Sequence, residues 1–294
     1  MISYESRAQI LSEALPYIQK FSGKTLVIKY GGNAMVNEIM RNAVVSDCLL
    51  LSLVGIHVVL VHGGGPEINE MMEKVGKESR FINGLRYTDN ETVEIVQMVL
   101  AGKVNKNLVS IVNAAGGKAI GLCGIDAELL KCKKTIDQNG TDYGYVGEVT
   151  DVNEKLILDC LKDGYMPVIA TVACGEDGHA YNVNADTAAA KIAGKINAEK
   201  IILLTDTKGV LKNKEDESTL ISRIKTTDIS GYIQDGFIQG GMIPKINCCA
   251  TAIQEGVKSA HILDGRVEHS VLIEVLTEKG IGTMIYEEGK YNEF

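Results

Sequence analysis

Apolar residues follow two alternating patterns along most of the chain. Continuously apolar runs, typical of strands buried on both faces of a sheet, occur at residues 25–30, 57–61, 166–170, 200–205 and 258–263. Between them, apolar residues recur at helical spacing. The helices predicted in this way cover residues 38–54, 66–75, 90–101, 103–114, 186–193 and 244–255. This alternation predicts an α/β protein with an open, mainly parallel central sheet sandwiched by helices.

Two segments depart from the alternation. Apolar positions from Ile10 to Phe21 mark an amphipathic helix before the first strand, so we expect an extra N-terminal helix that the core does not require. The polar, glycine-bearing stretch 132–149 predicts a β-hairpin. A lobe boundary is expected at 194–197, after the alanine-rich helix. The predicted parts are the helix 1–22, an N-terminal lobe 23–196 and a C-terminal lobe 197–294.

Composition narrows the functional classes. The 294 residues are 45% hydrophobic, enough for a large core, and the net charge of -8 argues against nucleic-acid binding, which needs a basic face. The seven cysteines show no zinc-ligand spacing, so we expect small buried side chains in a reducing cytosol. Charged residues interrupt every candidate signal or membrane segment, and a cytoplasmic location without membrane contact is expected.

Two of the predicted strands end in glycines. The first runs into Lys29-Tyr30-Gly31-Gly32 and the second into His62-Gly63-Gly64-Gly65-Pro66. Such turns expose backbone N–H groups at the carboxyl edge of a sheet, where ligands of open α/β sheets bind. With Lys29 beside them, they predict a site for a densely negative group such as a transferring phosphoryl group. A lysine that reaches solvent at the sheet edge is the alternative for Lys29.

A second lysine follows another pair of glycines, in Gly240-Gly241-Met242-Ile243-Pro244-Lys245. Pro244 suits the first turn of a helix, and a lysine there opposes the helix dipole unless an anion also binds. An ordinary solvent-exposed lysine is the alternative. The phosphate loop GxxxxGK[ST] and the protein-kinase signatures are absent from the sequence. A kinase would therefore take its positive charge from these lysines and its anion holes from the glycine turns.

Three further polar positions suit a small anionic substrate. Arg86 stands in an apolar neighbourhood and could bind a carboxylate or form a structural ion pair. Asn182 and Asp186 flank the start of the alanine-rich helix. Asn182 could bind a substrate and Asp186 could hold the lysines in position; the alternative is that the segment only caps the helix. Asp206 ends a buried strand and could border a nucleotide or simply form a turn.

Six motifs in order give the chain a specific resemblance. They are residues 27–35, 62–66, 84–88, 182–186, 204–206 and 240–245. Together they span nearly the whole chain, and the chain resembles the acetylglutamate kinases of the amino-acid kinase family. The resemblance implies phosphorylation of the γ-carboxylate of N-acetyl-L-glutamate by ATP, with Mg²⁺ held mainly by the nucleotide and no metal site of the protein's own, in arginine biosynthesis.

The resemblance also implies roles for individual residues. Lys29 and Lys245 would stabilise charge on the phosphoryl group, and Asp186 would orient the two lysines. N–H donors to that group and to the attacked carboxylate would come from Gly32, Gly64 and Gly65. Arg86 and Asn182 would join Gly64 and Gly65 in holding the substrate. The nucleotide would contact both lysines together with Thr205, Asp206, Gly209, Val210, Gly240 and Gly241. The N-terminal lobe would bind the acylamino acid and form a dimer, and the C-terminal lobe would bind the nucleotide.

The extra helix and the tail segment 261–284 resemble the arginine-inhibited, hexameric type of this family. The resemblance implies that the helix interlaces dimers into a trimer of dimers, and that L-arginine binds between helix and tail. The implied arginine-site residues are Tyr17, Lys195, Glu274, Gly280 and Gly282, with Glu274 pairing with the guanidinium. A simple packing helix and a structural tail are the alternative. The sequence does not indicate whether a signalling protein binds.

Two other functions stay open at this point. One is an amino-acid kinase that acts on carbamate, aspartate or glutamate. The other is a non-catalytic arginine-sensing module, against which the intact lysines and Asp186 argue.

Overall fold

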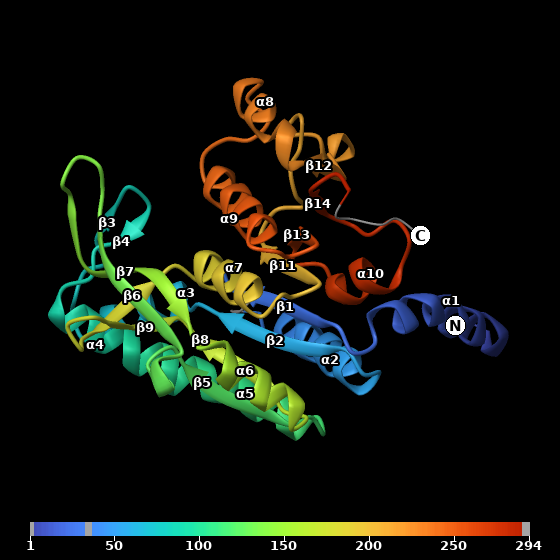
Figure 1. Ribbon diagram of the computed structural model, residues 1–294, viewed down its shortest axis with the longest axis horizontal. Coiled ribbons are helices and arrows are strands. Elements are labelled where there is room, and N and C mark those ends of the chain that lie inside the picture. Colours follow the sequence, from blue (N-terminus) through green and yellow to red (C-terminus); the bar gives the residue numbers. More distant parts are fainter. Residues whose placement is uncertain (1–2, 33–36, 290–294) are drawn as a thin grey trace.

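A computed structural model describes residues 3–32 and 37–289 (Figure 1). Asn33, Ala34 and Met35, the end of the first motif, lie outside the described residues. An eight-stranded sheet forms the centre. Its strands, in order across the sheet, are β12 (Arg223–Lys225), β14 (Thr283–Tyr286), β13 (Ser259–Asp264), β11 (Lys200–Thr205), β1 (Thr25–Tyr30), β2 (His57–His62), β8 (Met166–Ala170) and β5 (Ala119–Cys123). Within this sheet, as far as residues 3–32 and 37–289 describe it, only β13 and β14 pair antiparallel, which confirms the predicted open, mainly parallel sheet.

Both faces of the sheet are covered, as the continuously apolar strands require. Along β1, Leu26 and Ile28 join the hydrophobic cluster on one face, and Val27 joins the cluster on the other. The first face is covered by α2 (Glu38–Leu53), α3 (Gly65–Lys74), α5 (Asn105–Ala114) and α10 (Ser270–Leu276). The second is covered by α6 (Glu154–Lys162), α7 (Ala185–Lys195), α8 (Ile229–Gln234) and α9 (Met242–Gln254). The result is a helix–sheet–helix sandwich.

A small β-structure leaves the main sheet. β6 (Leu130–Ile136) and β7 (Asp142–Val152) pair antiparallel, which confirms the hairpin predicted at 132–149. They close into a four-stranded barrel with β9 (Val172–Gly175) and β10 (Ala180–Val183). A short hairpin, β3 (Phe81–Ile82) and β4 (Leu85–Arg86), lies beside it (Figure 1).

One long helical stretch corrects the sequence reading. The two helices predicted at 90–101 and 103–114 are continuous: α4 (Asn90–Gln97) passes through a π-helix, Met98–Val104, into α5. Burial of Leu100 and Leu108 outweighs the helix-breaking tendency of Gly102. By length and composition alone Asn90–Ala114 could cross a membrane, but 44% of its most apolar window is buried. A core helix of a folded domain meets the same criterion.

The extra N-terminal helix is confirmed as α1 (Tyr4–Phe21), which projects from one end of the molecule beside α10 (Figure 1). Ser3 caps it, and Phe21 anchors its last turn in the core. The expected boundary at residues 194–197 covers the last two residues of α7 and the first two residues after it. Because β11 pairs with β1, the regions before and after this boundary share one sheet.

Candidate active site

Three charged side chains meet at the carboxyl edge of the sheet. Lys29 Nζ lies 2.9 Å from one oxygen of Asp186, and Lys245 Nζ lies 2.7 Å from the other. Lys29 comes from the end of β1, Asp186 from the first turn of α7 and Lys245 from the first turn of α9. Asn184 caps α7 by accepting from the Asp186 N–H at 2.9 Å, which fixes where the carboxylate begins. One carboxylate thus holds two lysines from distant parts of the chain.

The electrostatics of this cluster favour its ionised form. Burial opposes the negative charge of Asp186, but Lys29 and Lys245 outweigh it and hold the pKa of this carboxyl below its usual value. Both carboxylate oxygens are engaged by the lysines. Two positive charges against one negative leave the cluster with a net charge of +1, which suits an anionic ligand.

The second glycine turn faces this cluster. Gly64 is the N-cap of α3 and Gly65 its first residue. Among the described residues, neither N–H donates to an acceptor. Free N–H groups at a helix N-terminus form an anion-binding site. The turn therefore offers hydrogen-bond donors where the lysines offer charge.

A cavity of about 320 Å³, the glycine-turn cavity, brings these groups together. Besides Lys29, Asp186 and Lys245 it is lined by Gly31, Gly32, Gly63, Gly64, Gly65, Arg86 and Asn182. All predicted phosphoryl-site and substrate residues thus border one space.

Arg86 is held from several sides without a carboxylate. Its guanidinium donates to Ser79 Oγ at 2.8 Å and to Asn69 Oδ1 at 2.7 Å, and it stacks 4.8 Å from the ring centre of Phe81. No acidic side chain in the described part of the chain forms an ion pair with Arg86, so the structural ion pair considered above is not observed. Because the guanidinium is largely buried and keeps its charge, a ligand carboxylate would complete its environment.

Asn182 reaches the same cavity from β10. Its amide nitrogen donates to Thr88 Oγ1 at 3.3 Å, and that hydroxyl donates to the Arg86 carbonyl at 2.8 Å. The small barrel therefore positions Asn182 relative to Arg86. Thr88 belongs to the motif 84–88 but was given no role there, and Asn69 and Ser79 were missed because no motif in the sequence marks them.

A second cavity of about 360 Å³, the β11–α9 cavity, opens beside the first. It contains Thr205, Asp206, Gly209, Val210 and Gly241 from the predicted nucleotide set. Gly240 is not among its lining residues. Its apolar lining includes Phe237, which no motif marks, and Met242, which belongs to the motif 240–245 but was given no role. Lys245 lines both cavities, so the two spaces meet at this lysine.

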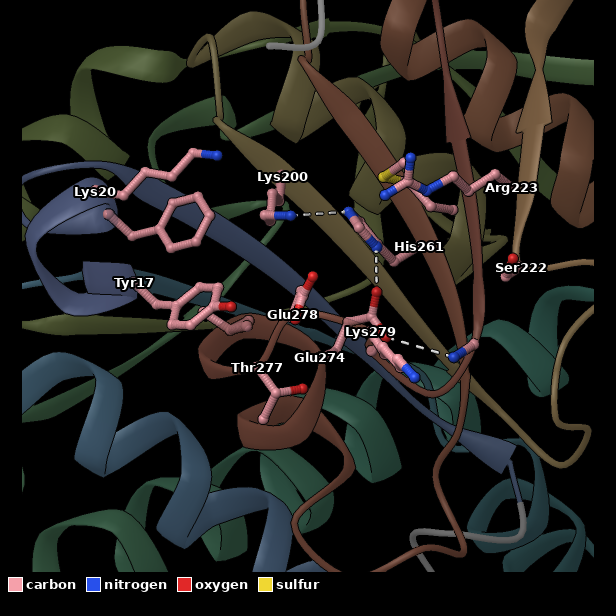
Figure 2. A pocket seen from close by; sticks show the side chains of 15 residues that line it. Tyr17, Lys20, Lys200, Ser222, Arg223, His261, Glu274, Thr277, Glu278 and Lys279 are labelled. Atoms are coloured by element: carbon pink, nitrogen blue, oxygen red, sulfur yellow. Dashed lines mark hydrogen bonds and ion pairs between the residues drawn. The ribbon is translucent and has the colours of Figure 1, made fainter. Parts of the chain in front are cut away.

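A third cavity of about 390 Å³, the tail cavity, lies between α1 and the tail (Figure 2). Tyr17, Glu274, Gly280 and Gly282 all line it. Lys195 does not: it ends α7 and pairs with Asp151 of β7 at 2.8 Å, in a different part of the molecule. The cations that line the tail cavity are Lys20, Lys200, Arg223 and Lys279.

Glu274 is the centre of a buried polar network in this cavity. One oxygen lies 2.7 Å from His261 Nδ1, and the other accepts from the Ile281 N–H at 2.8 Å. Burial opposes its charge, but His261 and the backbone lower the pKa of Glu274 to about 2. A Cβ on Gly280, which has φ +58°, would lie 2.4 Å from this carboxylate. Glycine there lets the tail close over Glu274.

Lys200 adds a cation to the same network. Its Nζ lies 3.2 Å from His261 Nε2 and 5.1 Å from the ring centre of Phe21 (Figure 2). Burial lowers the pKa of Lys200 to about 8. The ammonium is therefore largely charged at neutral pH and loses its charge in mildly alkaline solution.

Comparisons with known proteins agree with this geometry. The family model described as "Amino acid kinase family" matches residues 24–264. The chain belongs to the amino acid kinase family. It is 53% identical over 285 residues to an acetylglutamate kinase of Clostridium kluyveri, covering 97% of this chain and 100% of that one. An acetylglutamate kinase of Clostridium beijerinckii is 54% identical over 287 residues, again 97% and 100% of the two chains.

Solved structures share the fold at lower identity. N-acetylglutamate synthase from Neisseria gonorrhoeae, complexed with coenzyme A and N-acetyl-glutamate, superposes with a TM-score of 0.84 at 24% identity. That match covers 98% of this chain, which spans 64% of the synthase. Giardia carbamate kinase superposes with a TM-score of 0.63 at 16% identity, over 90% of this chain and 99% of that one. These two comparisons support the fold alone.

Proposed function

We propose that the protein is an acetylglutamate kinase, which transfers the γ-phosphoryl group of ATP to the γ-carboxylate of N-acetyl-L-glutamate in arginine biosynthesis. The observation that carries this proposal is the position of Lys245, which lines both the glycine-turn cavity and the β11–α9 cavity. One ligand in each cavity would meet at this lysine. The names of relatives 53–54% identical over nearly their whole length support the choice of substrate.

In this reaction the acceptor oxygen forms a bond to the γ-phosphorus while the bond from that phosphorus to the β–γ bridging oxygen breaks. ADP carries away the electron pair, and no proton is transferred because the attacking carboxylate is already ionised. Catalysis then depends on position and charge. Lys29 and Lys245 would neutralise the transferring group, Asp186 would hold them at 2.9 and 2.7 Å, and the Gly64 and Gly65 N–H groups would bind its oxygens.

The substrate would lie with its α-carboxylate on Arg86 and its acetylated nitrogen near Asn182, two groups that border the same cavity. Arg86 presents a planar fork that suits bidentate carboxylate binding. The adenine nucleotide would occupy the β11–α9 cavity along Thr205, Asp206 and Gly209. We place the enzyme in the cytoplasm, where ATP is available and its free cysteines stay reduced.

Mg²⁺ would reach this site on the ATP phosphates. In the described residues no group of three or more His, Cys, Asp or Glu side chains is arranged to hold a metal ion, and Asp186 already engages two lysines. When bound to the nucleotide, Mg²⁺ neutralises charge on the phosphates. The lysines would supply the remaining positive charge from the protein side.

A coupled assay of ADP release tests the substrate. N-acetylglutamate, glutamate, aspartate and carbamate are compared at equal concentrations with ATP and Mg²⁺. We expect N-acetylglutamate to give the highest kcat/KM, because only it offers both a carboxylate for Arg86 and an acylated nitrogen for Asn182. Faster turnover of an unacylated substrate would replace this proposal by another amino-acid kinase activity. No turnover with any substrate would favour a non-catalytic sensor.

We further propose that the tail cavity binds L-arginine as a feedback inhibitor. It offers carboxylates at Glu274 and Glu278 for a guanidinium, and cations such as Lys200 for an α-carboxylate. Tyr17 from α1 lines it together with these tail residues. A synthase structure with the same fold is complexed with coenzyme A and L-arginine, at 23% identity and a TM-score of 0.81.

We also propose a homo-oligomer in which α1 joins dimers into a trimer of dimers. Its apolar side chains Ile10, Leu11 and Leu15 are 52–74% exposed, although the helix pattern would suit a packed face. A second copy of α1 would cover them. Because α1 also lines the tail cavity, assembly and arginine binding would be coupled.

A further inference from the structure

His62 and Asn105 are buried polar residues beside the Gly63–Gly65 turn, and the phosphoryl-transfer steps described above do not use them. Both side chains are fully buried. His62 is the last residue of β2, and Asn105 is the first residue of α5, directly after the π-helix. Asn105 Nδ2 lies 3.1 Å from His62 Nε2. Such an internal contact needs a reason, because burying polar groups is costly.

The surrounding hydrogen bonds fix the tautomer of His62. Asn105 Nδ2 lies 2.8 Å from the Val168 carbonyl and 3.3 Å from the Leu122 carbonyl, while Asn105 Oδ1 accepts from Lys106 Nζ at 3.0 Å. The atom near two carbonyls must be the amide nitrogen, which can only donate. Its two hydrogens suit the two shortest of its three contacts, to the Val168 carbonyl at 2.8 Å and to His62 Nε2 at 3.1 Å. His62 Nε2 therefore accepts, and the ring proton resides on Nδ1. Burial lowers the pKa of His62 to about 4, so the ring is neutral at neutral pH.

The Nδ1 proton has a specific acceptor. His62 Nδ1 donates to the Gly63 carbonyl at 2.8 Å. In a trans peptide the carbonyl and the following N–H point in opposite directions. Holding the Gly63 oxygen on the histidine therefore sets the direction of the Gly64 N–H.

The preceding peptide group is held as well. The His62 carbonyl accepts from Thr171 Oγ1 at 3.3 Å, and the Gly63 N–H donates to the Tyr30 carbonyl at 3.3 Å. Both peptide groups before Gly64 are thus fixed by buried partners. The Gly64 N–H, by contrast, has no acceptor within residues 3–32 and 37–289.

Close contacts show that neighbouring backbone is built around this network. A Cβ on Gly121 would lie 2.1 Å from Asn105 Oδ1, so β5 leaves room for this amide only because the residue is glycine. A Cβ on Gly64 would lie 2.6 Å from Leu100 Cδ2 of the π-helix. The same helical stretch therefore packs on the turn and delivers Asn105, consistent with the frequent occurrence of π-helical turns at functional sites.

We propose that His62 and Asn105 are positioning residues that aim the Gly64 N–H at the anionic groups of the phosphoryl-transfer reaction. The inference rests on the proposed kinase function and adds to it residues that do not touch the substrates. Asn105 orients the ring of His62, His62 orients the Gly63–Gly64 peptide, and that peptide donates to the reacting group. Loss of this orientation lowers kcat and leaves nucleotide binding in the β11–α9 cavity intact.

The test compares two substitutions at one position. His62→Leu removes the donor to Gly63, and we expect kcat to fall about 10- to 100-fold, somewhat less than outright loss of an oxyanion donor. KM for ATP should change less than about twofold. His62→Asn places an amide nitrogen near the position of Nδ1, and we expect it to restore most of kcat. An unchanged kcat in His62→Leu, with wild-type turnover established in parallel, would overturn the positioning role. Absence of wild-type turnover would overturn the kinase proposal itself.

A matched pair on α5 separates positioning from stability. Asn113 also ties this helix to β5, through the Ala119 N–H at 2.7 Å and the Ala119 carbonyl at 3.3 Å, but at the other end of the helix. Asn105→Leu should lower kcat, whereas Asn113→Leu should lower only the melting temperature. Equal kcat losses in the two variants would contradict the inference.

A spectroscopic readout on the wild-type protein covers the case in which the variants do not fold. Two-bond ¹H–¹⁵N NMR spectra of histidine-labelled protein report the tautomer of each ring, and the His62→Asn spectrum, or elimination among the five histidines, assigns the signal. At neutral pH we expect the neutral Nδ1–H tautomer for His62. An Nε2–H tautomer or an imidazolium would overturn the network.

Discussion

Two buried carboxylates, Asp186 and Glu274, lie at opposite edges of the same sheet and show how one kind of group can serve two purposes. Asp186 lies at the carboxyl ends of the strands, near the end of β1, and both its oxygens hold lysines. Glu274 lies near the amino end of β11, and its oxygens engage a histidine and the tail backbone. Both have a lowered pKa. The difference lies in their neighbours.

Those neighbours determine what each site can bind. Around Asp186, two cations and free N–H groups face a shared cavity, which suits a transferring phosphoryl group. Around Glu274, the cavity wall carries both carboxylates and cations, which suits a ligand with charges of both signs. A buried carboxylate with a low pKa therefore does not by itself mark a catalytic centre.

The largest effect is expected from a substitution that disrupts the Lys29–Asp186–Lys245 cluster. Asp186→Asn removes the charge that holds Lys29 and Lys245, and we expect kcat to fall at least about 10²- to 10³-fold, the range for losing one preorganised donor. Steady-state kinetics measure it. Asp151→Asn is the matched control, because it removes the nearer of two carboxylates that pair with a lysine of α7, Lys195, on the exposed surface. A kcat of Asp186→Asn within about twofold of that of Asp151→Asn would show that Asp186 does not hold the two lysines for catalysis.

Glu274→Gln should affect arginine binding in the tail cavity and not catalysis. A charge-assisted hydrogen bond is worth about 1.5–3 kcal/mol, so arginine inhibition should weaken about 10- to 100-fold while kcat without arginine stays near wild type. Inhibition curves at fixed substrate concentrations measure both quantities. An unchanged inhibition constant would remove Glu274 from the arginine site, and a loss of kcat without arginine would show that the two regions are not separable.

The pH dependence of inhibition sharpens the comparison through Lys200. The pKa of Lys200 is lowered to about 8, so its side chain is mostly charged below pH 8 and mostly neutral above it. The titratable groups that face it are Lys20, Glu199, His261 and Glu274. If the ammonium binds the arginine carboxylate, inhibition should weaken about tenfold from pH 7 to pH 9. Lys200→Met removes this titration but not that of arginine itself, so its profile should be flatter. Parallel profiles would contradict the role of Lys200.

Deleting residues 1–22 tests the contribution of α1. The deletion removes Tyr17, Lys20 and Phe21 from the tail cavity. Loss of one aromatic contact of about 0.5–1.5 kcal/mol corresponds to roughly 2- to 10-fold weaker inhibition, so we expect inhibition to weaken by at least this much. It also removes the proposed contact between dimers. Light scattering should show a change from hexamer to dimer, with kcat retained. An unchanged particle mass together with an unchanged inhibition constant for arginine would contradict the proposed role of α1.

The sequence predicted the parts of this molecule whose signals are local. Apolar runs located most of the parallel strands. The glycines and lysines predicted to form a site do border one cavity, because strand ends in parallel sheets share one edge. The hairpin from β6 to β7 and the extra helix α1 were also predicted correctly. These features depend on pattern along a short stretch of chain.

Features that depend on packing could not be predicted in this way. The continuous passage from α4 to α5 through a π-helix was missed, because burial of Leu100 and Leu108 outweighs what Gly102 suggests. Lys195 was grouped with the tail residues, but it ends α7 and pairs with Asp151, whereas Lys200 at the start of β11 lines the tail cavity. Only the structure shows which of these lysines lies near the tail. Asn69 and Ser79 support Arg86 from positions that no spacing rule connects.

In the proposed reaction, Lys245 contacts both substrates at the transferring phosphoryl group, because it lines both cavities. The most direct test measures two quantities, kcat and the affinity for N-acetylglutamate by calorimetry, and compares them between Lys245→Ala and Lys191→Ala. Lys191 is the matched control, because it pairs with Glu255 and so also joins α7 to the end of α9, away from both cavities. We predict that Lys245→Ala loses at least about 10²-fold in kcat while binding N-acetylglutamate nearly as wild type, and that Lys191→Ala keeps both. Equal kcat values in the two variants would contradict the account.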